Sequence, residues 1–293
     1  MKETPSTFLP CRKFIAPVLL SIISAVTLQA QDFALATSQI RHFLNTNTLV
    51  VLEPNPLREY NILIPEITGK EWTITTAGII SYDDFLARRR DPLCSFLILT
   101  EVYFTADRLK TKYQFLSLLM GGNYPGINQM PELCTLPLAY LDADEDTYLY
   151  KLPALLRFMQ QFILRYKDTD EDITLDGALV GVNTPRLATK TLCLLSTDVE
   201  PGLLRQKQLG KVYPYPLKIV TQEELTEVIS RGDPDMVFLH KVGPVNGTMK
   251  ARCYKVIMGA GDGTVYYFDY HMADEGKYNG LLRSDFQKMA NFR

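Results

Sequence analysis

Three histidines, His42, His240 and His271, are the side chains of this sequence best suited to move protons near neutral pH. His271 follows Asp269 by two residues in a β-rich run, and a carboxylate beside an imidazole can support general-base chemistry. We therefore take His240, Asp269 and His271 as candidate catalytic residues. The sequence has no G-x-S-x-G nucleophile elbow, so it does not indicate which reaction such a site would serve.

Polar residues near His240 and in the β-rich runs that follow it are candidates for ligand binding. Lys241 follows His240, and Arg252 begins the next β-rich run. If these strand ends meet, they would line one edge of a polar pocket together with Asp269 and His271. Tyr267 adds a large apolar ring with a polar tip, which suits sugar or protein surfaces. The alternative is that these groups are ordinary rim residues with satisfied hydrogen bonds.

Metal and cofactor motifs are absent from the sequence. HExxH and paired-cysteine spacings do not occur, and the calcium-like spacing of Asp142, Asp144 and Asp146 lacks the glycine and glutamate that a calcium loop needs. Gly259–Gly263 resembles a phosphate loop, but a strand follows it where such a loop requires a helix. We expect a tight hairpin there, and neither a metal nor a cofactor.

The first thirty residues predict export. Lys2, Arg12 and Lys13 precede an apolar run from Phe14 to Val26, and Ala30 offers a small residue for cleavage. The run is shorter than the ~20 residues of a spanning helix. We expect a signal peptide over residues 1–30, no transmembrane helix after cleavage, and a bacterial protein of the periplasm or cell surface.

Charge and cysteine usage narrow the classes of partner. Removing residues 1–30 takes away three basic residues and one acidic residue, so the formal net charge of −2 becomes −4. That balance, without a basic stripe, argues against nucleic acid as a partner. The four cysteines that remain lie in apolar runs without a disulfide framework, so we favour buried thiols while pairing stays open. They are Cys94, Cys134, Cys193 and Cys253.

The chain contains an internal duplication. Thr48–Leu52 returns as Thr191–Leu195, Tyr82–Phe85 as Gln222–Leu225, and Ala143–Glu145 as Ala273–Glu275, always in the same order. The offset drifts from 143 to 130 residues, as insertions in the loops of the first copy would produce. Copies of this size correspond to small domains.

Periodicity predicts the same elements in each copy. The first copy shows strand, helix, strand, helix, strand, then two strands without a helix between them, which indicates a βαβαβ unit closed by a hairpin. We expect an α/β fold of two such βαβαβ-ββ repeats, with mixed sheets and packed helices. The predicted parts are a helix over residues 31–46, a first repeat over 47–166, a connector over 167–189 and a second repeat over 190–293. The long helix closing the first repeat is expected from Asp144 to Tyr166.

Three segments carry a resemblance to a known family. They are Asp91–Leu97, Phe238–Pro244 and Tyr267–His271. With them the chain resembles a family of exported bacterial proteins without an assigned activity. The resemblance covers most of the mature chain and implies no functional residue.

These features favour a secreted binding or interaction module. Two sheets packed about a pseudo-twofold axis would leave a groove between the copies, and ligand sites prefer such junctions. The partner could be a small molecule, a glycan or an envelope protein. The alternatives are a hydrolase with an acid–base site in the second repeat, and a component of an envelope assembly with a large exposed apolar patch.

Overall fold

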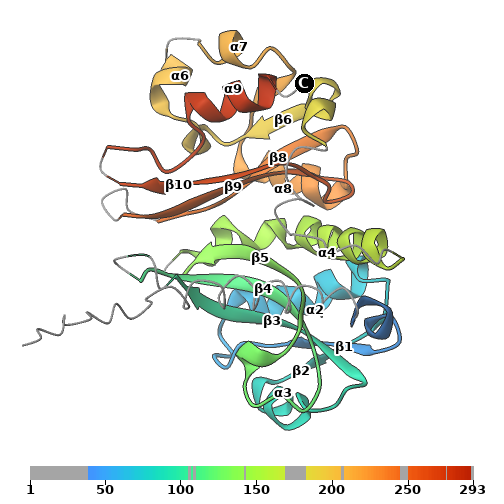
Figure 1. Cartoon of the computed structure of the whole chain (residues 1–293). Coiled ribbons are helices and arrows are strands. Elements are labelled where there is room, and N and C mark those ends of the chain that lie inside the picture. The colour runs from blue at the N-terminus through green and yellow to red at the C-terminus, as the bar shows by residue number, and fades with distance from the viewer. Residues whose placement is uncertain are drawn as a thin grey trace, which may run out of the picture.

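The computed structural model describes residues 39–104, 107, 110–141, 143–168, 183–205, 208–244, 250–274 and 276–291. These residues form an α/β fold with two mixed five-stranded sheets, ordered β2-β1-β3-β4-β5 and β10-β9-β8-β6-β7 (Figure 1). In each sheet three neighbouring strands are parallel and the remaining two form an antiparallel hairpin at one side. The shared order confirms the predicted pair of βαβαβ-ββ repeats.

The first repeat contains β1 (Asn47–Val51), α2 (Glu59–Glu71), β2 (Thr76–Ile80), α3 (Tyr82–Arg88), β3 (Cys94–Tyr103), β4 (Lys112–Met120), β5 (Glu132–Tyr140) and α4 (Leu152–Tyr166). The second contains β6 (Thr191–Leu194), α6 (Pro201–Arg205), α7 (Leu209–Val212), β7 (Leu217–Ile219), α8 (Gln222–Arg231), β8 (Met236–Val242), β9 (Ala251–Gly259), β10 (Val265–Ala273) and α9 (Arg283–Asn291). Short 3-10 turns lie between them, among them η2 (Glu145–Thr147), η3 (Leu149–Lys151), η4 (Thr184–Thr189) and η5 (Ser196–Asp198).

The same local signal begins the equivalent helices α3 and α8. Ser81 caps α3 and Thr221 caps α8, each accepting a hydrogen bond from the backbone N–H three residues later. Asp84 and Glu224 complete the two capping boxes by accepting from the cap residue's own N–H. Both helices therefore start at the same kind of local sequence signal.

Strand register corrects the sequence alignment of the two copies by one residue. Asn47 pairs with Cys94 at the start of β3, and Thr191 pairs with Met236 at the start of β8. Asn47, not Thr48, is thus the counterpart of Thr191. A slip of one residue moves every side chain of a strand to the opposite face, so similarity of residue type alone could not fix this register.

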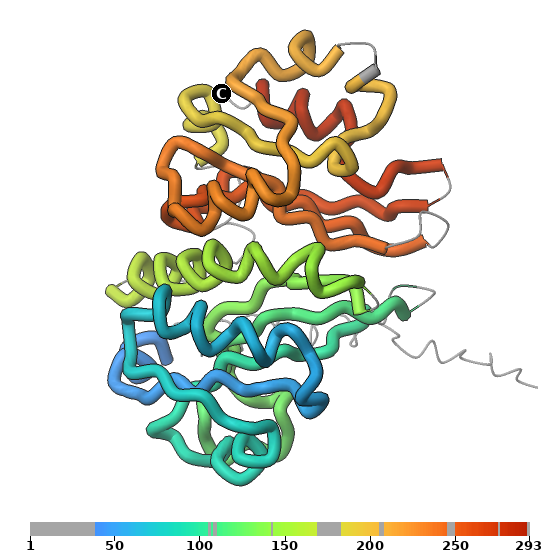
Figure 2. The backbone as a smooth tube through the Cα atoms, turned by 180° about the vertical axis from the view of Figure 1, so that it is seen from behind, coloured from blue at the N-terminus to red at the C-terminus, as the bar shows by residue number. Residues whose placement is uncertain are grey.

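The two repeats stack front to back, which corrects the expected pseudo-twofold packing. Helices α2 and α4 cover the inner face of the first sheet, and α8 covers the inner face of the second (Figures 1 and 2). The counterpart of α8 in the first repeat is α3, which lies on the outer face there, where Phe85 packs on Phe96. Opposite faces of the repeat therefore meet, as in a heterologous interface.

Helix α4 lies between the sheets and belongs to the cores of both repeats. Arg157 forms an ion pair with Glu71 of α2 and donates to the carbonyls of Ile229 and Ala260 in the second repeat. The hairpin between β9 and β10 packs against the same helix. A Cβ on Gly263 would lie 2.6 Å from the Ala154 carbonyl oxygen, and φ of +69° also favours glycine there.

Helix α2 runs through Gly69 to Glu71, because Glu71 is held by Arg157 and that contact offsets the cost of an exposed glycine. One predicted helix boundary is wrong. The long helix begins at Leu152 instead of Asp144, since Pro153 fits only the first turn. Two 3-10 turns, η2 and η3, occupy the preceding residues.

The remaining predictions concern the ends, the connector and the thiols. Residues 39–43 are helical, with Ile40 and Phe43 buried, and residues 183–189 of the connector contain η4. The predicted signal peptide, residues 31–38 and most of the connector lie outside the described residues. All four cysteines named above are buried and free. None of the helices in the described part has the length and apolarity needed to cross a bilayer.

Candidate functional site

The polar residues predicted at the strand ends lie on two faces of the second sheet. Cross-strand pairs place His240 opposite Val256 on the inner face, and Lys241 opposite Lys255 on the outer face. Asp269 pairs with Lys255, so it shares the outer face with His271, two residues along β10. The expected single pocket edge is therefore divided by the sheet itself.

His240 is part of the junction between the repeats. Its side chain is fully buried, and Nε2 lies 2.7 Å from the Pro137 carbonyl oxygen of β5. Burial lowers the pKa of His240 to about 3, and nearby Lys151 acts in the same direction. The ring is neutral at physiological pH, so Nε2 donates to Pro137. Copy one has Ile98 at the equivalent position, which faces α3.

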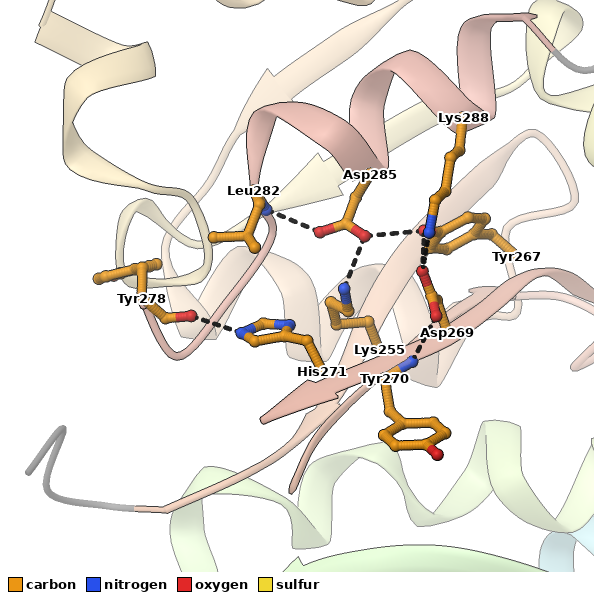
Figure 3. A network of polar contacts seen from close by, with 9 residues as sticks. All are labelled: Lys255, Tyr267, Asp269, Tyr270, His271, Tyr278, Leu282, Asp285 and Lys288. Atoms are coloured by element: carbon orange, nitrogen blue, oxygen red, sulfur yellow. Dashed lines mark hydrogen bonds and ion pairs between the residues drawn. The ribbon is translucent and has the colours of Figure 1, made fainter. Parts of the chain in front are cut away.

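Asp269 and His271 have separate partners on the outer face (Figure 3). His271 Nε2 lies 2.8 Å from the Tyr278 carbonyl oxygen, and burial lowers the pKa of the ring. Asp269 pairs with Lys288 of α9 at 2.6 Å. Burial raises the pKa of Asp269, but the Lys288 hydrogen bond and the charge of Lys255 outweigh this and lower it overall. The imidazole and the carboxylate thus point to different groups.

A buried ion pair ties α9 to the outer face. Lys255 and Asp285 are each 1% exposed, and their charged atoms lie 2.6 Å apart. The Tyr267 hydroxyl lies 2.8 Å from Asp285 and 3.0 Å from Asp269, and it donates its single hydrogen to one of them at a time (Figure 3). Burial beside Asp285 raises the pKa of Tyr267, so the phenol stays protonated. Tyr267 is thus a structural donor inside this network.

Arg252 is occupied by contacts across the repeat junction. Its guanidinium binds Asp107 with two hydrogen bonds of 2.7 and 2.9 Å and lies over the ring of Phe104. Its backbone N–H donates to the Tyr113 hydroxyl of β4. Bidentate pairing of this kind fixes the guanidinium in place.

A cavity of about 230 Å³ lies between the two repeats and includes one of the predicted residues. The end of β5 and the turns η2 and η3 form one wall, and η5, the end of β8 and the loop before α9 form the other. Its polar lining includes Thr147, Lys151, Asp198, Gln222, Lys241 and Asn279. Lys241 is the sequence candidate that reaches it, from the rim of the second sheet.

Lys151 is a buried ammonium group in the wall of this cavity. The residue is 4% exposed, and within the described ranges its Nζ makes neither a hydrogen bond nor an ion pair, lying instead 5.1 Å from the centre of the Tyr150 ring. Burial lowers the pKa of Lys151 to about 8, with Asp198 opposing this shift and Lys241 adding to it. Buried ammonium groups without an anion are costly and commonly mark functional positions.

The groups around Lys151 leave it without a partner of its own. Asp198, itself buried, pairs with Lys241 at 3.3 Å and accepts the Leu195 N–H. Asn279 donates through Nδ2 to the Pro244 carbonyl, which leaves its buried Oδ1 as an acceptor without a donor. The cavity wall therefore contains an unpaired cation, and an unsatisfied amide oxygen is packed behind it against Gly243.

A larger cavity of about 380 Å³ lies beside the C-terminal end of α4. Its polar side chains have partners: Arg165 lies over Tyr166, Arg186 over Tyr266, and Asn183 donates to the Val265 carbonyl. Volume alone favours this cavity. The smaller cavity is the stronger candidate because its wall contains the buried ammonium group of Lys151.

Sequence reasoning missed Lys151, Asp198 and Asn279. A signal did exist for Lys151, which is the one charged residue between Tyr148 and Leu156 in an otherwise apolar run. Asp198 and Asn279 lie in short polar loops 81 residues apart, where nothing local distinguishes them. Only the stacking of the second repeat on the first brings them to Lys151.

Searches for a metal site and for relatives add no further assignment. Among the residues that the structure describes, no cluster of three or more His, Cys, Asp or Glu side chains could hold a metal ion. Comparison with protein-family models, with curated proteins and with solved structures finds no match to this chain.

Proposed function

We propose that this chain is an exported binding protein whose ligand occupies the cavity between its two repeats. The observation that carries the proposal is Lys151, a nearly fully buried ammonium group without an ion-pair or hydrogen-bond partner among the described residues, in a cavity wall. A position of this kind is costly for folding, and a ligand that pairs with it would offset the cost. Export follows from the predicted signal peptide.

The geometry favours binding over hydrolysis. General acid–base catalysis needs its partners within hydrogen-bond reach or one water apart. His42, His240 and His271 each place Nε2 against a backbone carbonyl oxygen, namely those of Pro92, Pro137 and Tyr278. The proposed role is therefore recognition, with the hydrolase as the less supported alternative.

An envelope assembly is a further alternative. It predicts one large apolar patch on a single repeat, and of the nine large apolar side chains exposed among the described residues, seven belong to the first repeat and two to the second. They are Leu57, Ile62, Ile79, Leu86, Leu93, Tyr103, Leu164, Ile219 and Tyr270.

A ligand screen with a plugged cavity tests the proposal. Thr147→Trp would fill the cavity mouth from an exposed position in η2, losing one hydrogen bond to the Asp144 carbonyl. Thr189→Trp is the matched control, since Thr189 is also exposed in a 3-10 turn and donates to the carbonyl three residues earlier. Small-molecule hits that raise the melting temperature should be lost in the first variant and kept in the second. Hits that survive both substitutions would place the ligand elsewhere.

A further inference from the structure

We infer that the inter-repeat cavity takes a small organic monocarboxylate whose negative group pairs with Lys151. The inference rests on the proposed binding function and adds the chemical class of the ligand. It draws on the charge of the cavity, its size and its polar lining.

The charge of the cavity requires one negative group. Among the described residues that line it, Lys151 and Lys241 are cationic and Asp198 is anionic, so the three together carry one excess positive charge. The other titratable groups of the described ranges that line the cavity or face Lys151 are His240, kept neutral by burial, and the phenols of Tyr140, Tyr148 and Tyr150. A monoanion would neutralise this charge, whereas a dianion such as sulfate would leave a negative charge beside Asp198. A carboxylate is the monoanion that an ammonium group binds with charge-assisted hydrogen bonds.

The volume and the polar lining restrict the rest of the ligand. An engineered cavity of about 150 Å³ holds benzene, so by proportion about 230 Å³ holds roughly nine non-hydrogen atoms. The side chains of Thr147 and Gln222 also line the cavity. A hydroxyl or amino group on the ligand can hydrogen-bond with them, so hydroxy and amino monocarboxylates fit better than plain fatty acids.

Isothermal titration calorimetry with paired probes tests the inference. Lactate, benzoate and 2-hydroxyhexanoate would each be titrated beside the neutral amide of the same skeleton, with sulfate as the dianion. At least one carboxylate should bind at least tenfold more tightly than its amide and than sulfate. Amides that bind as well as the acids, or the absence of binding by all three acids at 10 mM, would overturn the inference.

Variants separate a ligand partner from a structural lysine. Lys151→Met should fold, because an apolar side chain of similar volume replaces a buried charge, and should lose at least tenfold in carboxylate affinity. Lys211→Met removes the same charge at an exposed position of α7 and should leave the affinity unchanged. Equal affinities for the two variants would exclude Lys151 as the partner of the carboxylate.

The pH dependence of carboxylate affinity distinguishes a ligand partner from a structural lysine, because a purely structural Lys151 would not make the affinity depend on its own protonation. The anion binds the ammonium form of Lys151, and the pKa of that group is lowered to about 8. Carboxylate affinity should therefore fall roughly 30-fold between pH 7 and pH 9.5, and Lys151→Met should abolish this dependence. A flat profile in the unmodified chain contradicts the inference.

This inference and the proposed function can fail separately. Neutral compounds that bind wild type but not Thr147→Trp would keep the cavity as the ligand site and reject the carboxylate. If none of the hits depends on Thr147, the proposed site itself fails.

Discussion

Most of the polar residues that the sequence suggests as functional make contacts that stabilise the fold. His240 donates to a carbonyl of the other repeat, Arg252 is clamped by Asp107, and Tyr267 bridges two carboxylates. Lys151 differs because its charged end has no such partner among the described residues. At this scale, burial together with missing partners separates a candidate binding residue from a structural one.

His240 should make the protein sensitive to acid. Its pKa is about 3 in the folded chain and near 6.5 when unfolded, so the unfolded state binds more protons between these values. Stability is therefore lost as pH falls from about 6.5 towards 3, by up to about 1.4 kcal/mol per pH unit. His240→Gln can keep the bond to Pro137 and should reduce that slope, measured by urea unfolding between pH 6.5 and pH 4.5.

His42→Gln is the matched control for this measurement. His42 also places Nε2 against a backbone carbonyl, at 2.8 Å from Pro92, but its side chain is exposed. The slope should remain that of wild type. Identical slopes for the two variants would show that His240 does not stay neutral in the fold.

Helices α4 and α9, which close the two repeats, differ in how much of their surface is buried. This difference decides whether a further sheet can pack on them. Helix α4 buries nine of its fifteen residues because sheets lie on both sides of it. Helix α9 buries Asp285, Phe286 and Met289 and exposes Arg283, Gln287 and Lys288. A helix that is polar on one face can cover a sheet but cannot be sandwiched between two.

The buried pair that holds α9 gives a prediction at this scale. Asp285→Asn leaves the Lys255 ammonium group buried without its anion and should cost about 3–5 kcal/mol of unfolding free energy. Lys288→Met breaks the more exposed pair with Asp269 and should cost less than about 1 kcal/mol. Urea unfolding measures both, and hydrogen exchange of α9 localises the effect. Similar losses of unfolding free energy in the two variants would mean that burial does not determine the cost of breaking an ion pair.

The double variant Lys255→Met/Asp285→Leu separates the effect of charge from the effect of packing. Removing both charges leaves no unpaired ion, so its stability should return to within about 1–2 kcal/mol of wild type. A double variant as unstable as Asp285→Asn would assign the loss to packing instead of charge.

The hairpin that contacts α4 offers a second test. Gly263→Ala places a methyl group against the backbone of Ala154 and Phe158 at a positive φ, and should cost at least about 2 kcal/mol. Gly210→Ala in α7 meets nothing within 4 Å and should stabilise by about 0.5–1 kcal/mol. Thermal unfolding followed by the fluorescence of Trp72, which lies in the shared core, measures both. A neutral Gly263→Ala variant would contradict the tight contact.

At the scale of the whole molecule, the front-to-back stack joins the two repeats into one folding unit. A single core contains α4 together with Leu225, Val228 and Phe238 of the second repeat. Counted from the helix caps, Arg88 at the end of α3 and Arg89 directly after it stand where α8 has Val228 and Ile229. Charged residues at the free end therefore prevent a further copy from stacking there, as polar caps do in repeat proteins.

The isolated second repeat, residues 190–293, should not fold alone. Without α4 its inner face would expose Leu225, Val228, Phe238 and Met258 to water. We expect binding of a hydrophobic dye, aggregation and no cooperative thermal transition, whereas the full chain should unfold in one step. A cooperative transition of the fragment near the midpoint of the full chain would show that the repeats are independent domains.

The sequence by itself determined the duplication, the order of elements and the caps of α3 and α8, because these depend on local periodicity and on residues within one turn of each other. It left open the strand register, which changes face with a shift of one residue. It also could not decide which faces of the two repeats meet, since each face is apolar enough to be covered. Only the tertiary structure places Lys151, Asp198 and Asn279 around one cavity, because their proximity comes from packing between residues more than 40 positions apart.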